Sequence, residues 1–538
     1  MKKRILALLI AIATVFTVVG CGNGNGNGNG NGSGSGNGGG GDSDNKTLKI
    51  TVSKLGYGTE WLKKIVSAYE TKTGAKVEVV EPVGSAGIDA IYAEMESLAS
   101  DSDIFMTRQR HFFETIYKGS ISVGGKKYPC QYADLTDVYE AKDESGSSIM
   151  DRTDPLTREY FNMDGKYYGL CWANGVFGIV RNKDVWDSLG FTDDDVPLTT
   201  DQLLAVCDTI KTKSTGADGI APFIYSYDDE YYTSIAPIWF GQYEGVQSMG
   251  YFGKGLDPAG QSTYNVYAYD GQLKSLEFLN ELIKDFNGYQ HKASKDLTFT
   301  DMQAYFAMGQ AVFCVNGGWL EVESSTARKK NLDFIKTPVI SALSEKLSYY
   351  NEADKAGNDQ KLAELIKFVD AHAEKGDNEG RPSYATEEDV QIVREARQFA
   401  YLSSDRDHIA SIPAYSKHID TAKDFLKFMY SDAGLQIYYE TTGGAKMPYA
   451  TVGNYDETKI TKSRFRKSIE SAMEEGYFLD YNSYVKAKLY SIGKVDLYYH
   501  NGITATAMKA LLEGTTPAEI VNINAKYLQT NWKTITDY

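Results

Sequence analysis

The side chains in this sequence that are best suited to contact a ligand are aromatic rings. The chain of 538 residues contains 39 Tyr, 22 Phe and 6 Trp, which together make up 12% of it. This is more ring area than a core of this size requires, and rings outside a core offer flat faces for stacking. The composition therefore hints at a ligand that is bound by stacking.

The residue patterns that mark common enzyme active sites are missing. The sequence has no GxSxG nucleophile elbow, no HExxH zinc motif and no GxxxxGKS phosphate loop, and its six His residues lack ligand spacing. The acidic run at 193–195 could mimic a glycosidase pair. In a chain with 72 acidic residues, however, a solvated loop is the better interpretation. We therefore expect no catalytic residues, no metal and no cofactor.

Charge argues against a nucleic-acid partner. The chain carries 56 basic and 72 acidic residues, a net charge of −16, and has no long basic run beyond its first four residues. Binding to a phosphate backbone needs clustered Lys and Arg on one face. The size fits two or three folding units with sizeable cores, and we expect a monomer.

The five cysteines exclude two further classes of site. They lie at wide spacings, with no pair separated by two residues, so zinc-ribbon and thioredoxin-like motifs are absent. Two possibilities stay open for four of them, since they could pair as exported cysteines do or remain free buried thiols. These are Cys130, Cys171, Cys207 and Cys314.

The first residues predict the location of the protein. A basic start, Met1–Arg4, precedes an uncharged apolar run of fifteen residues at 5–19, which suits a signal peptide and is too short to span a membrane. The run ends in Val-Val-Gly-Cys at 18–21, which resembles a bacterial lipobox. The resemblance implies removal of residues 1–20 and lipidation of Cys21, which would anchor the protein to the outer face of the cell membrane. Residues 22–41 are only Gly, Asn and Ser, so 21–45 is predicted to be the lipidated Cys and a flexible tether.

From residue 48 the hydrophobic pattern alternates between strands and helices. An alternating strand at 48–53 precedes a helix with Trp61 on its apolar face, a second strand at 77–80, a second helix at 88–98 and a buried strand at 103–106. This βαβαβ pattern predicts a parallel sheet with helices on both faces and a ligand beyond the carboxyl ends of its strands.

A second alternation follows from residue 176. Strands at 176–180 and 221–225 are separated by a helix that begins at Thr200, and a strong helix pattern covers 273–286. Residues 340–400 are charged and helical, and we interpret them as a helical excursion on one lobe.

Three segments in order resemble a known family. They are YGLCWANGVFGIVRNKDVWDSLGF at 168–191, MQAYFAMGQAVFCVNGGWLEVE at 302–323 and AYSKHIDTAKDFLKFMYSDAGLQIYYETTGGAKMP at 414–448. With the lipobox and the first βαβ unit, they are similar to the extracellular solute-binding proteins of bacterial carbohydrate ABC importers, the maltose-binding-protein-like group. The resemblance implies an α/β two-lobed periplasmic-binding-protein-like fold of type II, with each lobe a mainly parallel sheet flanked by helices and a multi-strand hinge between the lobes.

The resemblance also suggests how the chain divides between the lobes. Lobe one is expected to combine 46–170 with 300–410, including the helical excursion, and lobe two to combine 171–299 with 411–538. The crossings are expected near 168–172, 299–306 and 408–413.

Sugar recognition needs flat aromatic platforms and hydrogen-bonding side chains at their edges, because a sugar has C–H faces and a rim of hydroxyls. Trp319 follows two glycines after an apolar strand, which favours a loop over a core position, and the family carries a sugar-stacking aromatic there. Trp172 and Asn174 lie at the first crossing, which would face the cleft from either lobe.

Further candidates come from both lobes. Arg108 and Gln109 follow a lobe-one strand where relatives place polar sugar ligands, and planar Arg donors suit paired hydroxyls. Each of these candidates has an ordinary alternative, packing for a ring and a solvated loop for an Arg. The remaining ring candidates near the first strand are Tyr57 and Trp61. In lobe two they are Tyr231, Tyr232, Trp239 and Phe240, and we expect one of these four to contact ligand.

The sequence thus predicts a tethered, non-catalytic receptor that captures a carbohydrate, with an oligosaccharide favoured, in the cleft between the lobes. It would deliver this ligand to the permease subunits of an ABC transporter. A surface glycoside hydrolase and a binding protein for a non-sugar solute, such as a peptide or polyamine, are the alternatives.

Overall fold

The computed structural model describes residues 47–536, except 55, 83–85, 109–111, 144, 215–218, 228–230, 285–286, 374–375, 405, 407, 454, 476–477 and 480–505. The chain divides into two units, 1–45 and 46–538, and every described residue lies in the second. The predicted signal peptide, Cys21 and the tether therefore lie outside the described residues. None of the described helices is both long enough and apolar enough to cross a membrane.

The first lobe is built on a five-stranded sheet. The strands are, in spatial order, β2 (Lys76–Val80), β1 (Thr47–Val52), β3 (Ile104–Arg108), β12 (His408–Ser411) and β6 (Leu170–Cys171). The strand β1 pairs in parallel with β2 and β3, as the βαβαβ pattern predicts, while β12 runs antiparallel to both of its neighbours.

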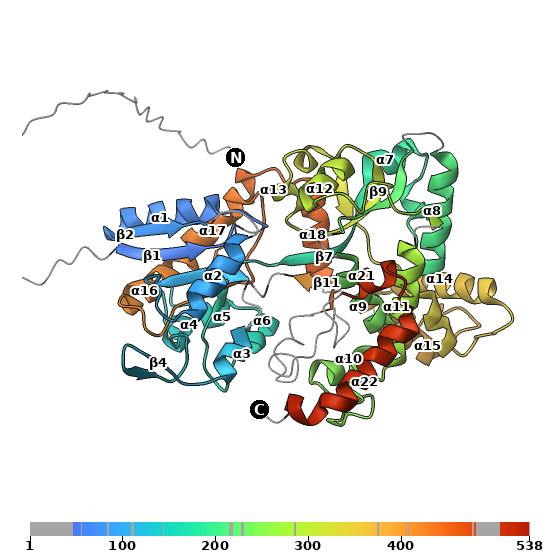
Figure 1. Ribbon diagram of the computed structural model, residues 1–538. Coiled ribbons are helices and arrows are strands. Elements are labelled where there is room, and N and C mark those ends of the chain that lie inside the picture. The colour runs from blue at the N-terminus through green and yellow to red at the C-terminus, as the bar shows by residue number, and fades with distance from the viewer. Residues whose placement is uncertain are drawn as a thin grey trace, which may run out of the picture. The chain divides into compact units, whose positions relative to one another are not determined.

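Helices cover this sheet because their apolar stripes match its faces. Helix α1 (Glu60–Thr73) buries the predicted stripe that starts with Trp61 and ends with Tyr69, and it ends at Gly74 in a left-handed conformation that suits glycine. It packs against α17 (Asp432–Thr441) and α16 (Ile419–Met429), as Figure 1 shows at the left of the view. The other elements of this lobe are α2 (Ala86–Glu96), α3 (Phe112–Tyr117), β4 (Ile121–Val123), β5 (Lys126–Tyr128), α4 (Thr136–Glu140), α5 (Ile149–Arg152) and α6 (Pro155–Phe161).

The second lobe contains a six-stranded mixed sheet. Its spatial order is β13 (Phe478–Leu479), β11 (Tyr401–Ser404), β7 (Gly175–Asn182), β9 (Ala311–Gly317) and β8 (Ala221–Ile224), with β10 (Leu332–Phe334) also paired to β7. All eight residues of β7 are buried, and β7 runs antiparallel to β9, β10 and β11. The two-lobed α/β fold is confirmed. The expectation of mainly parallel sheets is wrong, because β12 in lobe one and β7 in lobe two run antiparallel to every strand with which they pair.

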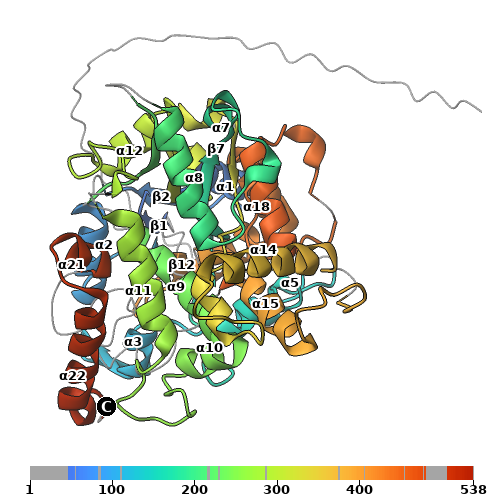
Figure 2. The same cartoon turned by 90° about the vertical axis from the view of Figure 1, so that its right-hand side faces the viewer.

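Two groups of helices enlarge the second lobe. Helices α14 (Lys355–Ala371) and α15 (Glu387–Gln398), from the predicted excursion, pack on each other, and α15 packs on α9 (Tyr231–Glu244). Near the carboxyl terminus, α21 (Ala507–Leu512) and α22 (Pro517–Thr536) pack along α11 (Asp270–Ile283) (Figure 2). The remaining helices of this lobe are α7 (Lys183–Ser188), α8 (Thr200–Lys213), α10 (Val246–Gly253), α12 (Phe299–Ala307), α13 (Leu320–Glu323) and α18 (Arg464–Glu475).

The chain divides between the lobes differently from the predicted division. Strands β9, β10 and β11, and the helices at 340–400, belong to lobe two, whereas 408–449 belongs to lobe one. The chain crosses at 172–174, between β11 and β12, and between α17 and α18. The predicted crossing at 299–306 is wrong, because α12 packs on β9 inside lobe two. Which sheet an apolar strand joins is decided by long-range pairing, which its own sequence does not reveal.

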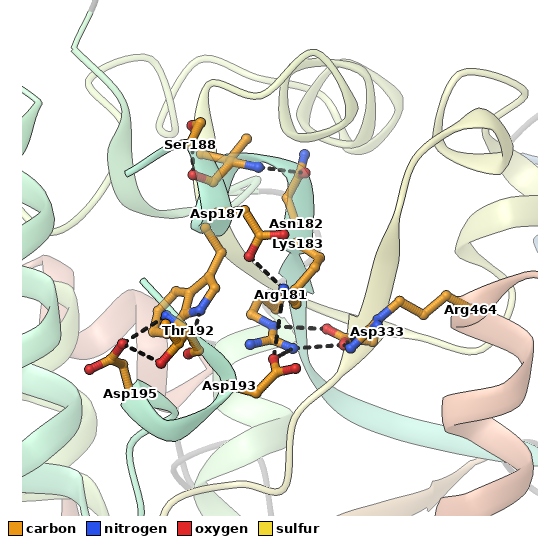
Figure 3. A network of polar contacts seen from close by, with 12 residues as sticks. Arg181, Asn182, Lys183, Asp187, Ser188, Thr192, Asp193, Asp195, Asp333 and Arg464 are labelled. Atoms are coloured by element: carbon orange, nitrogen blue, oxygen red, sulfur yellow. Dashed lines mark hydrogen bonds and ion pairs between the residues drawn. The ribbon is translucent and has the colours of Figure 1, made fainter. Parts of the chain in front are cut away.

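A buried ion-pair network holds β7, β10 and α18 together (Figure 3). The Arg181 guanidinium donates from Nε and Nη2 to the two carboxylate oxygens of Asp333, at 3.0 and 2.8 Å. Arg464 donates to the same carboxylate at 2.8 Å, and Asp193 accepts from Arg181 Nη2 at 3.0 Å. Helix α18 is the first helix after the chain crosses from lobe one to lobe two between α17 and α18. The network therefore fixes the end of this crossing to the lobe-two sheet.

The cysteines among the described residues form no disulfide. Cys130, Cys171, Cys207 and Cys314 are all buried as thiols. Burial raises the pKa of the Cys207 and Cys314 thiols well above the ordinary value, so these thiols stay protonated and unreactive. The alternative of free buried thiols is the one that the structure supports.

Candidate functional site

The ends of several strands meet at one edge of the lobe-one sheet. Strands β1, β3 and β6 run in the same direction, so the segments that follow them emerge at the same edge. Tyr57 follows β1, Arg108 ends β3 and Trp172 follows β6. Because β12 runs the opposite way, it begins at this edge, with His408 opposite Arg108. The topology thus brings together candidates that are far apart in the sequence.

The lobe-two sheet presents a matching edge. Strands β8, β9 and β11 run antiparallel to β7, so their carboxyl ends meet the start of β7. Tyr231 lies beyond β8, Trp319 lies beyond β9, and Asn174 directly precedes β7. Residues 172–174 lead straight from β6 to β7, and only three residues separate β11 from β12. These short connections make the two edges neighbours, at the junction between the lobes.

Trp319 lies at the centre of this junction. Its half-buried side chain packs against the apolar cores of both lobes. On the lobe-two side the ring stacks with Phe177, with centroids 6.2 Å apart, and meets Tyr231 edge-on at 6.3 Å. On the lobe-one side it lies beside the loop after β1, since a Cβ on Gly56 would be 3.0 Å from Trp319 Cβ. Trp319 therefore belongs to a group of rings at the junction.

Gly317 is the residue that allows the Trp319 ring to fold back over the end of β9. A Cβ at position 317 would lie 2.2 Å from Cη2 of that ring, which is inside van der Waals contact. We expect Gly317→Ala to displace the indole and to weaken ligand binding as much as removal of the ring does. Ligand titration of Gly317→Ala beside Gly250→Ala, whose Cβ would meet no atom within 4 Å, tests this. Equal affinity of the two variants would contradict it.

Trp172 and Trp61 form a stacked pair beneath the junction. Both side chains are fully buried, and their ring centroids lie 5.6 Å apart. Trp172 and His408 form a T-shaped pair with ring centroids 4.8 Å apart. Its buried Nε1 has no hydrogen-bond partner, which is uncommon for an indole in a core. In this structure neither ring of the pair has an exposed face on which a ligand could stack. The unpaired N–H of Trp172 is the polar group that the pair could offer to a ligand as a hydrogen-bond donor.

The other predicted residues lie at the junction, in the lobe-two core or outside the described residues. Tyr57 and Asn174 are at the junction, where the Tyr57 hydroxyl donates to the Asn174 carbonyl at 3.4 Å. Arg108 and Asn174 are partly exposed, and Gln109 lies outside the described residues.

Tyr232 and Trp239 lie in the lobe-two core, where Tyr232 contacts Phe223 and Trp239 contacts Phe278. Tyr231 is half-buried between Phe177 and Phe299, so it is the predicted lobe-two ring that the structure places beside Trp319.

Sequence reasoning missed three residues of this junction. Phe177 is one apolar residue in an apolar strand, and His408 carries no motif, so neither gave a signal. Asn316 did give one, as a polar residue at the end of the apolar run at 311–315. Its side chain is fully buried, and its Nδ2 has no partner although its Oδ1 accepts from the Gly317 amide at 2.8 Å. No group of three or more potential metal ligands occurs among the described residues.

The comparison with known families identifies the class of protein. Residues 64–376 match the model of the family described as "Bacterial extracellular solute-binding protein". This match covers more than half of the chain, so the chain belongs to that family, whose members bind solutes outside the cell. No curated protein matches the sequence.

Solved structures of sugar receptors share the fold at low sequence identity. RafE of Streptococcus pneumoniae is 17% identical with a TM-score of 0.52, over 90% of this chain and 97% of RafE. The GacH receptor of Streptomyces glaucescens is 15% identical with a TM-score of 0.56, over 91% of this chain and 98% of the receptor. Maltose-bound MalE3 of T. maritima is 16% identical with a TM-score of 0.52, over 90% of this chain and 99% of MalE3.

Proposed function

We propose that this solute-binding protein captures a carbohydrate, with an oligosaccharide favoured, between its two lobes and delivers it to the permease of an ABC transporter. The observation that carries the proposal is the group of half-buried rings at the junction, Trp319 and Tyr231. The names of similar structures add support, since they include RafE in complex with raffinose, GacH in complex with acarbose and a chitin oligosaccharide binding protein.

The chemistry of the junction suits a sugar. The face of Trp319 can stack on the C–H face of a pyranose ring, and Tyr231 can flank it. Polar groups nearby can serve the hydroxyls, because Arg108 has planar donors, Asn174 is partly exposed and Trp172 Nε1 is an unused donor. Buried polar atoms are normally paired, so a ligand that satisfies the indole N–H would recover a hydrogen bond that the protein alone does not make.

A thermal-shift screen tests this proposal. The chain would be heated with raffinose, maltose, xylo-oligosaccharides and chito-oligosaccharides, and with peptides and polyamines as non-sugar solutes. A ligand at 1,000 times its Kd stabilises the folded state by about 4 kcal/mol, which gives a clear rise in Tm. A rise with a peptide or polyamine alone would support the non-sugar alternative, and cleavage products in the sugar samples would support the hydrolase.

We further propose that a lipid on Cys21 holds the protein at the outer face of the cell membrane. We expect Cys21→Ser to abolish labelling with a palmitate analogue, because thioether formation and acylation need that thiol, while the fold beyond residue 46 stays intact. Labelling of cells that express each form, followed by fractionation, measures this. Lipid incorporation into the Ser variant would contradict the lipobox assignment.

A further inference from the structure

Arg466 contacts both lobes beside residues 317–319, which we call the Trp319 turn. It lies on α18, the first helix after the last crossing, and only 2% of it is exposed. Its guanidinium donates from Nη2 to the carbonyl of Gly318, the residue before Trp319, at 3.4 Å. Its aliphatic part lies against lobe one, since a Cβ on Gly444 would be 3.3 Å from Arg466 Cγ. One side chain therefore touches the Trp319 turn and the neighbouring lobe.

A buried carboxylate accompanies Arg466. Glu321 lies two residues after Trp319 and is 6% exposed, and its Oε2 accepts from Ser463 Oγ at 2.7 Å. The same Ser463 Oγ accepts from the Arg466 backbone N–H at 2.9 Å. Burial raises the pKa of Glu321 although the positive charges of Arg466 and Arg328 lower it. Glu321, Ser463 and Arg466 thus form a small polar cluster, which we call the turn anchor.

The hydrogen bonds of the turn anchor are incomplete. In the described structure Glu321 Oε1 and Arg466 Nε are both buried without a hydrogen-bond partner. Buried groups left unpaired in this way lower stability. The contact with Gly318 therefore requires a buried guanidinium that is only partly paired, which points to a role for Arg466 beyond stability.

We propose that Arg466 is a positioning residue that sets the orientation of Trp319 through the Gly318 carbonyl and ties it to lobe one at Gly444. This inference rests on the proposed function for its consequence, because an indole held in one orientation binds a ligand without first losing its own freedom. The positioning itself can be observed without any ligand.

Fluorine NMR of the full chain labelled with 5-fluorotryptophan tests the proposal. The six Trp residues give six resonances, and the Trp319 signal is assigned by its loss in Trp319→Phe. We expect Arg466→Met to shift or broaden the Trp319 signal and to leave the Trp186 and Trp532 signals unchanged. Arg466→Lys, whose ammonium can still reach the Gly318 carbonyl, should restore the signal in part.

The matched control removes a positive charge near Glu321 without touching the turn. Arg328 is exposed and is the other cation that acts on Glu321, so Arg328→Met should leave the Trp319 signal in place. A Trp319 signal that is unchanged in Arg466→Met, or that moves equally in Arg328→Met, would overturn the proposal. If Arg466→Met folds poorly, Arg466→Lys is compared with Arg328→Met instead. The proposal then predicts a change of the Trp319 signal in Arg466→Lys alone, and an equal signal in the two variants would overturn it.

The two proposals fail in different experiments. If the wild-type chain binds no sugar in the thermal-shift screen while Arg466→Met still moves the Trp319 signal, the function is wrong and the positioning role stands. If raffinose or another sugar binds, Arg466→Met should weaken its binding severalfold in titration calorimetry, whereas Arg328→Met should not.

Discussion

Trp319→Ala is expected to weaken ligand binding roughly 70-fold to 400-fold. Aromatic stacking contributes about 0.5 to 1.5 kcal/mol beyond area burial, and the lost apolar contact adds about 2 kcal/mol. Stability should fall less than the 3 to 5 kcal/mol that is typical of a fully buried Trp, because the Trp319 side chain is only half-buried. Calorimetry of unfolding and of ligand titration on the same variant measures both quantities.

The control for this experiment is a Trp that lies in a core. Trp239 is fully buried in lobe two against Phe278, and its Nε1 has no hydrogen-bond partner, so Phe can replace it without breaking a bond. Trp239→Phe should therefore lower Tm while affinity stays at the wild-type value. If Trp319→Ala instead lowered Tm sharply and left the affinity unchanged, Trp319 would be a core residue and the ligand site would have to lie elsewhere.

Asp333→Asn is expected to lower the free energy of unfolding by about 3 to 5 kcal/mol, the usual cost of breaking a buried ion pair from one side. The Asp333 side chain is 7% exposed and its carboxylate faces two guanidinium groups. An Asn side chain has the size of Asp but no charge, and its amide N–H would face a guanidinium N–H, which is also a donor. The buried Arg181 would then keep one carboxylate partner, Asp193, whose side chain is 64% exposed. Denaturant unfolding measures the loss.

A surface ion pair provides the comparison. Asp137 pairs with Lys423 at 2.6 Å, but its side chain is 59% exposed, so Asp137→Asn should cost at most about 1 kcal/mol. Similar losses for the two variants would mean that burial does not strengthen the Arg181 network.

The amino-terminal βαβαβ part of the first lobe could be predicted in detail because its signals are local. The apolar stripe of α1, its end at Gly74 and the strands on either side follow from the spacing of residues within about 60 positions. The assignment of later segments failed for a different reason. Strand β9 is a short, mainly apolar run and β11 has only four residues, and nothing in such short segments indicates which sheet they will join. Their membership of lobe two is decided by pairing with β7, which lies over 130 residues earlier than β9.

For the candidate site, the sequence alone determined the kinds of side chain that are available and some of their positions. An aromatic-rich chain without enzyme motifs, with Trp319 after two glycines, predicts a binding protein with a ring in a loop. Tertiary structure decided which rings gather at the junction, since Tyr231 lies beside Trp319 while Tyr232 and Trp239 are in the lobe-two core. Neighbouring residues on one helix point in different directions, so only the packing of that helix on its sheet determines which ring faces the other lobe.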